Sequence, residues 1–247
     1  MITEKRWQKA QKHELESHKP LFQKDSTDPL TKDYWREHLD IITQIRPDLN
    51  IRRILEVGCG PFGPIHYLDF GDRYGIDPLM DQYLLLKKDS QSIHFSDGKG
   101  EALPYSDNFF GKIICINVLD HVQDPMKVIS EIYRTLRKNG ILYFSVNTYG
   151  PIATAYKTVK EKLGKGSVYH PYTFTEGMVE SKLLKSGFRA LKKFRNLKYQ
   201  ADIRTGRLSN DSSLKLRDFP YLFDTFFSKD IPLGHYIKDV FFVCEKV

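Results

Sequence analysis

The chain lacks any long apolar run, and it has only three cysteines and two tryptophans among 247 residues. No stretch of about 18 apolar residues occurs, so no membrane-spanning helix is expected. Met1 to Arg6 are followed by further charged residues and by no apolar segment, so no secretory signal peptide is expected either. Cys59, Cys115 and Cys244 are far apart and predict neither a disulfide framework nor a metal site. A reducing, cytoplasmic location fits this cysteine usage.

Positive charge is concentrated in the last two-fifths of the chain. The formal net charge is +7, but residues 1–150 contain 20 Lys and Arg against 21 Asp and Glu. Residues 151–247 contain 18 against 10, a net charge of +8. Such asymmetry indicates either an anionic partner for this part of the chain or a solvated, lysine-rich surface.

Short apolar runs alternate with helical stretches from residue 52 onward. The runs end at glycine or polar residues, and they lie at 54–57, 74–76, 113–116 and 141–146. This alternation is typical of a parallel sheet covered by helices on both faces, an α/β fold. In such sheets ligands bind beyond the carboxyl ends of the strands.

Other segments complete a single predicted domain. Helices are expected at 3–17, 31–46, 124–138 and 173–186, and strands at 188–197 and 238–246. The long segment 199–236, first basic and then aromatic, is interpreted as an insertion. We therefore expect an N-terminal helical cap or lid (1–46), a core (47–198), the insertion (199–236) and a last strand (237–247).

A glycine-rich loop follows the first apolar run. Gly58, Gly60 and Gly63 match the spacing of a nucleotide-binding loop, and Asp77 stands about 20 residues further on, where it could bind a ribose diol. Glu56 ends the preceding strand. Its negative charge disfavours a pyrophosphate such as that of NAD and favours a ligand with an ammonium or sulfonium group.

Six motifs in order resemble those of the class I S-adenosylmethionine-dependent methyltransferases, of the type 11-like family. They are Ile54-Leu-Glu-Val-Gly-Cys-Gly-Pro61, Tyr74-Gly-Ile-Asp-Pro78, the segments 98–110, 114–122 and 136–144, and the pair 170–175 and 185–188. The resemblance covers about residues 50–197 and the last strand. It implies a Rossmann-like, doubly wound, seven-stranded and mostly parallel sheet with an antiparallel last strand, together with N-terminal helices and the late insertion.

The same resemblance implies S-adenosylmethionine as cofactor and gives roles to individual residues. Gly58, Cys59 and Gly60 would line its methionine part, and Glu56 would orient its amino group. Asp77 would bind the ribose, with Pro78 beside the adenine. Lys99, Gly100 and Glu101 would flank the adenine edge, and Asn117 and Val118 would offer carbonyls near the ammonium. Lys99 departs from the family pattern, since lysine cannot accept a hydrogen bond from the adenine amino group.

Two histidines are candidate catalytic bases. His121 follows the motif of the fourth strand, and His170 lies in a segment that borders the acceptor in the family. A base is needed only where the acceptor must lose a proton, and each histidine could instead be an ordinary polar residue. No metal ligand is predicted, and Asp120 is expected to cap the following turn.

The predicted reaction is transfer of a methyl group to oxygen or nitrogen of a small-molecule or saccharide acceptor. The basic half suggests that this acceptor is anionic. Two alternatives remain: an RNA methyltransferase, whose binding should fall steeply with salt, and a non-catalytic binding module that keeps the fold. The sequence predicts neither the oligomeric state nor a membrane partner.

Overall fold

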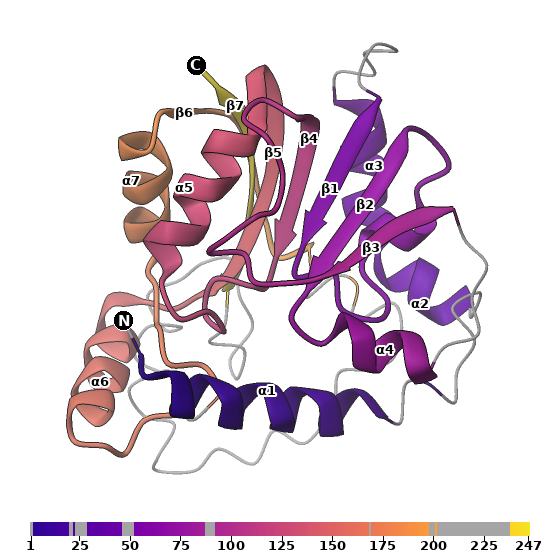
Figure 1. The fold of residues 1–247 in the computed structure, drawn as a ribbon. Helices are drawn as coiled ribbons and strands as arrows, with labels where there is room; N and C mark the ends of the chain where they lie inside the picture. The colour runs from indigo at the N-terminus through magenta and orange to yellow at the C-terminus, as the bar shows by residue number, and fades with distance from the viewer. Residues whose placement is uncertain are drawn as a thin grey trace.

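Seven strands form one sheet in the order β3-β2-β1-β4-β5-β7-β6 (Figure 1). The structure is a computed structural model that describes residues 2–19, 22, 29–45, 52–86, 92–167, 169–197, 201 and 238–247. The strands are β1 (Arg53–Val57), β2 (Asp72–Asp77), β3 (Ile93–Asp97), β4 (Phe110–Ile116), β5 (Leu136–Thr148), β6 (Phe188–Arg195) and β7 (Lys238–Lys246). β7 is antiparallel to both of its neighbours, and the pairs among β1 to β5 are parallel. The predicted mostly parallel sheet with an antiparallel last strand is confirmed.

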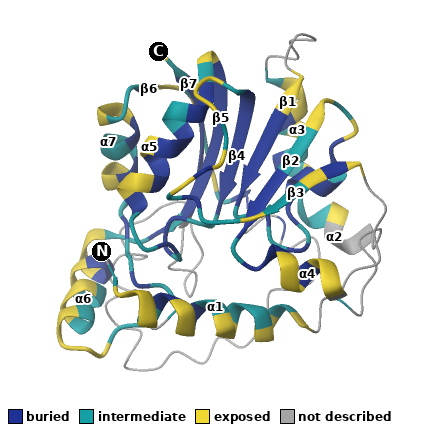
Figure 2. Cartoon of the chain, in the orientation of Figure 1, coloured by how far each residue is buried: buried dark blue, intermediate teal, exposed yellow. Residues whose placement is uncertain are grey.

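Helices cover both faces of this sheet, as expected for a doubly wound fold. They are α1 (Glu4–His18), α2 (Pro29–Tyr34), α3 (Arg36–Gln44), α4 (Met80–Leu86), α5 (Pro125–Thr135), α6 (Pro151–Lys162) and α7 (Glu176–Lys185), with a 3₁₀ helix at Pro64–Tyr67. One apolar cluster joins the sheet to α5 and α7, and a second joins its other face to α3 and α4. The central strands are buried on both sides (Figure 2), which explains why they read as continuous apolar runs.

Local chemistry sets the ends of the helices. Asp124 caps α5 by accepting hydrogen bonds from the backbone of Met126 and Lys127, and Pro125 occupies the first turn. The Thr175 side chain caps α7 in the same way. These two caps determine where the helices begin.

Several boundaries differ from the sequence predictions. The helix predicted at 31–46 is two helices, α2 and α3, that meet at Trp35. The helix predicted at 124–138 ends at Thr135, because Leu136 begins β5. β5 therefore starts five residues earlier than the apolar run at 141–146 suggested, since its polar first residues carry no apolar signal. The predicted insertion lies outside the described residues, apart from Ala201.

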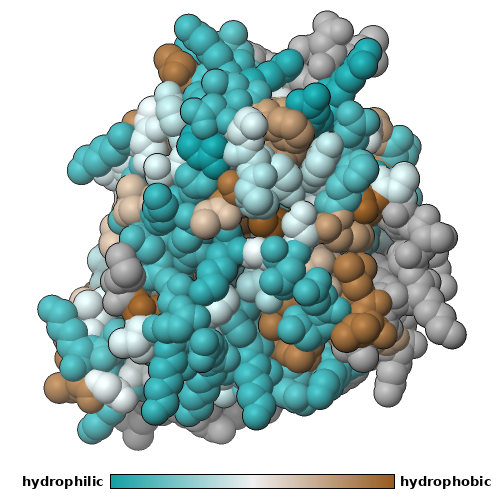
Figure 3. Space-filling view, viewed as in Figure 1, coloured by the Kyte–Doolittle hydropathy of each residue, from teal (hydrophilic) through white to brown (hydrophobic). Residues whose placement is uncertain are grey.

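The N-terminal helix α1 lies across the edge of the sheet at which β1, β2 and β4 end (Figure 1). It is charged on most of its surface and buries only Trp7 and Ala10. The face of the molecule around it is largely hydrophilic (Figure 3). Among the described residues, no helix combines the length and apolar character needed to cross a membrane.

Candidate active site

The predicted ligand-binding residues gather at one edge of the sheet. β1, β2, β3 and β4 are parallel neighbours, so the loops that follow them emerge side by side. These loops carry Gly58 to Gly60, Asp77 to Pro78, Lys99 to Glu101, and Asn117 to Val118. Parallel pairing thus brings together segments that are distant in the sequence.

The glycine loop depends on a close approach between backbones. Gly58 and Gly60 have φ of 67° and 51°, which L side chains rarely adopt. A Cβ at residue 58 would also lie 2.4 Å from Val118 Cγ2, whereas one at residue 60 would meet nothing within 4 Å. Gly58 N donates to Ile76 O at 2.8 Å, which ties the loop to β2.

Asp77 connects this loop to the end of β2. Its Oδ2 accepts from Gly60 N and its Oδ1 from Leu79 N, each at 2.9 Å. Burial raises the pKa of Asp77 to about 6, although both hydrogen bonds oppose that shift. The carboxylate therefore fixes the loop and also lines a cavity, because each oxygen retains further acceptor capacity.

Glu56 is the most deeply buried acidic group of the site. Its Oε2 accepts from Ile65 N at 2.8 Å. Burial raises the pKa of Glu56 well above its usual value, and the charge of Asp77 adds to the shift. A cationic ligand group nearby would restore the ionised form of this carboxyl.

The loop after β3 is held by contacts that the sequence did not indicate. The Lys99 amino group lies 3.8 Å from the centre of the Trp7 ring and 3.2 Å from Glu4 Oε2, so it binds α1. Glu101 Oε1 accepts from the backbone of Gln123 at 2.7 Å and of Asp124 at 3.2 Å. Glu101 thus braces the segment that leads into α5.

The segment after β4 presents an unpaired polar atom. Asn117 has a φ of 57°, and its backbone N–H donates to Ser145 O at 2.9 Å. Its side-chain Oδ1 is buried without a hydrogen-bond partner among the described residues. Buried polar atoms are nearly always paired, so this oxygen indicates a missing donor.

Two adjoining cavities contain all eleven predicted cofactor residues. The first, of about 100 Å³, is lined by Gly58, Gly60, Asp77, Pro78, Lys99, Gly100, Glu101, Asn117 and Val118. The second, of about 270 Å³, is lined by Glu56, Cys59 and Asn117 among others. Gly58, Gly60 and Asn117 line both, so the two cavities are parts of one cleft.

Helix α1 forms a wall of the cleft. Trp7, Gln11, Glu14 and His18 line the first cavity, and Glu14 and His18 also line the second. His18 Nδ1 lies 2.7 Å from the Tyr83 hydroxyl. The sequence predicted a cap or lid over residues 1–46, but the polar residues of α1 carry no motif that could have predicted their position in the cleft.

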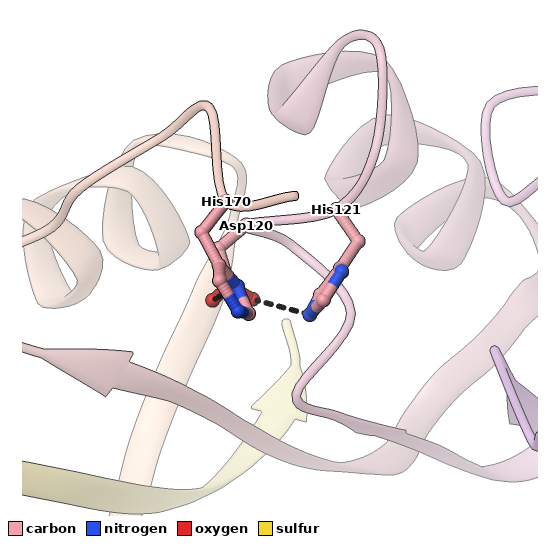
Figure 4. A group of neighbouring side chains, drawn as sticks. All are labelled: Asp120, His121 and His170. Carbon is pink, nitrogen blue, oxygen red and sulfur yellow. Dashed lines mark hydrogen bonds and ion pairs between the residues drawn. The ribbon is translucent and has the colours of Figure 1, made fainter. Parts of the chain in front are cut away.

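The two candidate catalytic histidines lie at one end of this cleft. His121 lines the first cavity, His170 lines a neighbouring one, and their ring centres are 4.4 Å apart. Between them lies Asp120, whose Oδ2 is 3.0 Å from His170 Nδ1 and whose Oδ1 is 3.9 Å from His121 Nε2 (Figure 4). Burial alone would raise the pKa of Asp120, but the His170 hydrogen bond and the charges of both histidines lower it.

The cavity beside His170 is basic. It measures about 660 Å³, and its lining includes Lys157, Lys160, Lys162 and Lys165, all from α6 or the residues after it. Glu161, an acidic residue of the same wall, is paired with Arg6 of α1. Six basic residues of the positively charged part are the candidates for contact with an anionic acceptor: Lys157, Lys160, Lys162, Lys165, Arg204 and Arg207. The four lysines surround this one cavity. The other two, Arg204 and Arg207, lie outside the described residues.

Comparison with known proteins finds a family model that matches the part of the chain around this cleft. Residues 55–144 match the model of a family described as "Methyltransferase domain". An uncharacterised protein of Mycobacterium tuberculosis is 26% identical over 155 residues, which cover 61% of this chain and 52% of that protein. The demethylmenaquinone methyltransferase of Renibacterium salmoninarum is 31% identical over 110 residues, 42% of this chain and 46% of that protein. The chain thus spans about half the length of these curated relatives.

A solved structure has the same fold. Phosphoethanolamine N-methyltransferase 2 of Haemonchus contortus, in complex with phosphomonomethylethanolamine and S-adenosylhomocysteine, superposes with a TM-score of 0.60 at 18% identity. The match covers 86% of this chain and 52% of that one. At this identity the likeness shows the fold alone.

Proposed function

We propose that this chain transfers methyl groups from S-adenosylmethionine to a small acceptor. Its residues 55–144 match the methyltransferase-domain family, and its fold is that of the class I S-adenosylmethionine-dependent methyltransferases. When bound, this cofactor supplies an activated methyl group on a sulfonium sulfur, which an acceptor atom attacks in line. The protein's task is to hold both partners in that geometry and to exclude water.

The observation that carries this proposal is the fit between the cleft and the cofactor. Asn117 Oδ1 lacks a hydrogen-bond donor at the point where a methionine ammonium would supply one. Among the described residues, Glu56 is a buried acid with no neighbouring cation, and the same ammonium would provide that positive charge. Asp77 ends the second strand and lines the cleft, and it would bind the ribose diol.

The other lining residues take the remaining roles. Gly58, Cys59 and Gly60 would contact the methionine part through their backbone, and Val118 would lie beside it. Pro78 would pack on the adenine, and Lys99, Gly100 and Glu101 would border its edge. Because Lys99 and Glu101 already bind α1 and the segment before α5, backbone atoms of this loop are better placed than its side chains for the adenine.

The acceptor would enter from the basic cavity. The four lysines of this cavity favour an acceptor that carries phosphate or carboxylate. The methylated atom would be an oxygen or a nitrogen. His121 and His170 separate that cavity from the cofactor cleft and would contact the reacting end of the acceptor. A small-molecule or saccharide acceptor suits a cavity of about 660 Å³.

Within this single domain, α1 would act as the lid of the cofactor cleft. The cleft as a whole measures about 370 Å³, at the lower end of the about 300–1,000 Å³ of small-molecule sites, and its part next to α1 measures only about 100 Å³. The cofactor would therefore require α1 to move outward and then close over it. The segment 1–46 would be the cap, 47–198 the core and 237–247 the last strand.

A transfer assay tests the proposal. The full chain is incubated with S-adenosylmethionine carrying a radiolabelled methyl group and with a panel of hydroxylated and amino-bearing phosphates, carboxylates and saccharides. We expect label in at least one anionic acceptor, and we expect the Asp77→Asn variant to lose the transfer. Absence of label from every acceptor, together with absence of cofactor binding, would contradict the proposal.

A further inference from the structure

The geometry points to a site for one divalent transition-metal ion, such as Zn²⁺, Fe²⁺ or Co²⁺, formed by Asp120, His121 and His170. One ligand atom from each of these side chains lies within 4.8 Å of the others. Two ligand atoms on the same ion are at most about 4.2 Å apart when each bond is about 2.1 Å long. Around a tetrahedral ion, ligand atoms at that bond length are about 3.4 Å apart, so the most distant pair must approach by up to about 1.4 Å to bind an ion.

The two oxygens of Asp120 have different environments. Oδ2 is hydrogen-bonded to His170, but Oδ1 is buried and has no hydrogen-bond partner among the described residues. Oδ1 lies 3.9 Å from His121 Nε2, which is too far for a hydrogen bond. It is about 0.5 Å longer than the separation of two atoms bound to one tetrahedral ion, and Figure 4 shows both side chains directed toward each other, so a small side-chain shift would bring them into range.

The chemistry of the donor set selects the kind of ion. Two imidazoles and one carboxylate suit transition metals, whereas Ca²⁺ and Mg²⁺ prefer oxygen ligands. Three protein ligands leave coordination positions open. Glu14 Oε2 faces the other ring nitrogen of His121 at 3.9 Å, on the side where ligand histidines usually have a carboxylate partner.

The cluster is also a place where positive charge is needed. Asp120 is about 3% exposed, and its Oδ1 has no hydrogen-bond partner among the described residues. A buried carboxyl group whose oxygen lacks a partner favours a cation beside it. A metal ion at this point would contact that oxygen and both histidines.

The position of the ion gives it a role that rests on the proposed function. His121 lines the cofactor cleft and His170 the basic cavity, so an ion between them would bind an acceptor oxygen where the two cavities meet. It would orient that oxygen and make a hydroxyl proton easier to lose. The histidines would then act as ligands rather than as bases. No local sequence motif predicts this site, because Asp120 and His170 are 50 residues apart in the chain.

Cobalt binding to the full, tag-free chain tests the site without any acceptor. After dialysis against a chelator, Co²⁺ is titrated and followed by its visible absorption, and bound metal is counted by elemental analysis. We expect one Co²⁺ per chain. Asp120→Asn and His170→Gln should each weaken binding at least about tenfold, whereas His94→Gln, at an exposed histidine of β3, should leave it unchanged.

A further variant tests the electrostatics of the site. The positive charge of Lys157 acts on Asp120, so Lys157→Met should keep or strengthen Co²⁺ binding by removing a repulsion. A loss of binding in this variant would contradict the assignment. Circular dichroism confirms folding, and if Asp120→Asn unfolds, His170→Gln decides, because that ring is partly exposed.

The outcomes separate this inference from the proposed function. Failure of Co²⁺ to saturate the wild-type chain, or equal binding in wild type and in His170→Gln, would overturn the metal site. Calorimetry with S-adenosylmethionine is run in parallel on the same protein. Cofactor binding without Co²⁺ binding overturns only the metal site, and Co²⁺ binding without cofactor binding overturns only the proposed function.

Discussion

The residues of the glycine loop show which features of the candidate site the sequence predicts and which it does not. The spacing of Gly58, Gly60 and Asp77 predicted a tight loop after the first strand, and the structure has such a loop with positive φ at both glycines. The hydrogen bond from Gly60 to Asp77 and the bracing role of Glu101 were not predictable. They depend on which loops become neighbours, and local sequence does not encode that.

Substituting the two glycines separates steric clash from backbone strain. Gly58→Ala would place its Cβ 2.4 Å from Val118, whereas Gly60→Ala has open space. We expect Gly60→Ala to incur only the left-handed backbone cost of about 1–2 kcal/mol, and Gly58→Ala to lose more stability. Urea denaturation of both variants measures the difference, and equal losses would contradict the close packing of Gly58 on Val118.

The raised pKa of Asp77 predicts a pH dependence of stability. An acid with a pKa of about 6 in the folded chain binds its proton more tightly there than in the unfolded chain, where the pKa is about 3.9. The free energy of unfolding should therefore fall as pH rises from about 4 to 6. Asp77→Asn should make this slope smaller. Part of the slope should remain, because the pKa of Glu56 is also raised in the folded chain. Urea denaturation across this pH range measures the slope, and an identical slope in wild type and variant would refute the assignment.

At the scale of elements, apolar patterning revealed buried structure and missed the rest. The buried segments of β1, β4 and β5 were located from their apolar runs. The polar first residues of β5 were missed, as was the amphipathic α6, which exposes Ile152 and Val159. The position of α1 across the strand ends is a tertiary feature fixed by contacts such as Trp7 with Lys99.

The lid role of α1 predicts a change in cofactor kinetics. Trp7 is about 8% exposed and lines the first cavity. We expect Trp7→Ala to raise the dissociation rate of S-adenosylmethionine about tenfold, since burial of a large side chain stabilises by about 1.5–3 kcal/mol. Lys9→Ala, an exposed position on the same helix, is the control. Stopped-flow measurements that give equal rates for the two variants would argue against a lid.

At the scale of the whole molecule, the charge asymmetry corresponds to a cavity. Residues 151–247 carry a net charge of +8, and four of their lysines surround the space beside His170. The sequence predicted the sign of this region but not that Lys157 to Lys165 would share one cavity, because that depends on where α6 packs. Arg6, from the opposite end of the chain, pairs with Glu161 of the same wall.

An inorganic anion probes this basic cavity directly. We expect pyrophosphate to bind the wild-type chain at low salt and to bind the double variant Lys157→Glu with Lys160→Glu at least about tenfold more weakly. Lys185→Glu, at an exposed site on α7, should bind as the wild type does. If calorimetry shows no difference between the double variant and the control, these lysines form only a solvated surface.

The central claim is that the cleft at the strand ends binds S-adenosylmethionine. Isothermal titration of the full chain with S-adenosylmethionine, and separately with NAD, tests it most directly. The arrangement of Glu56, Asp77 and Asn117 predicts saturable binding of one S-adenosylmethionine per chain and no binding of NAD. Binding of NAD without binding of S-adenosylmethionine would contradict the account.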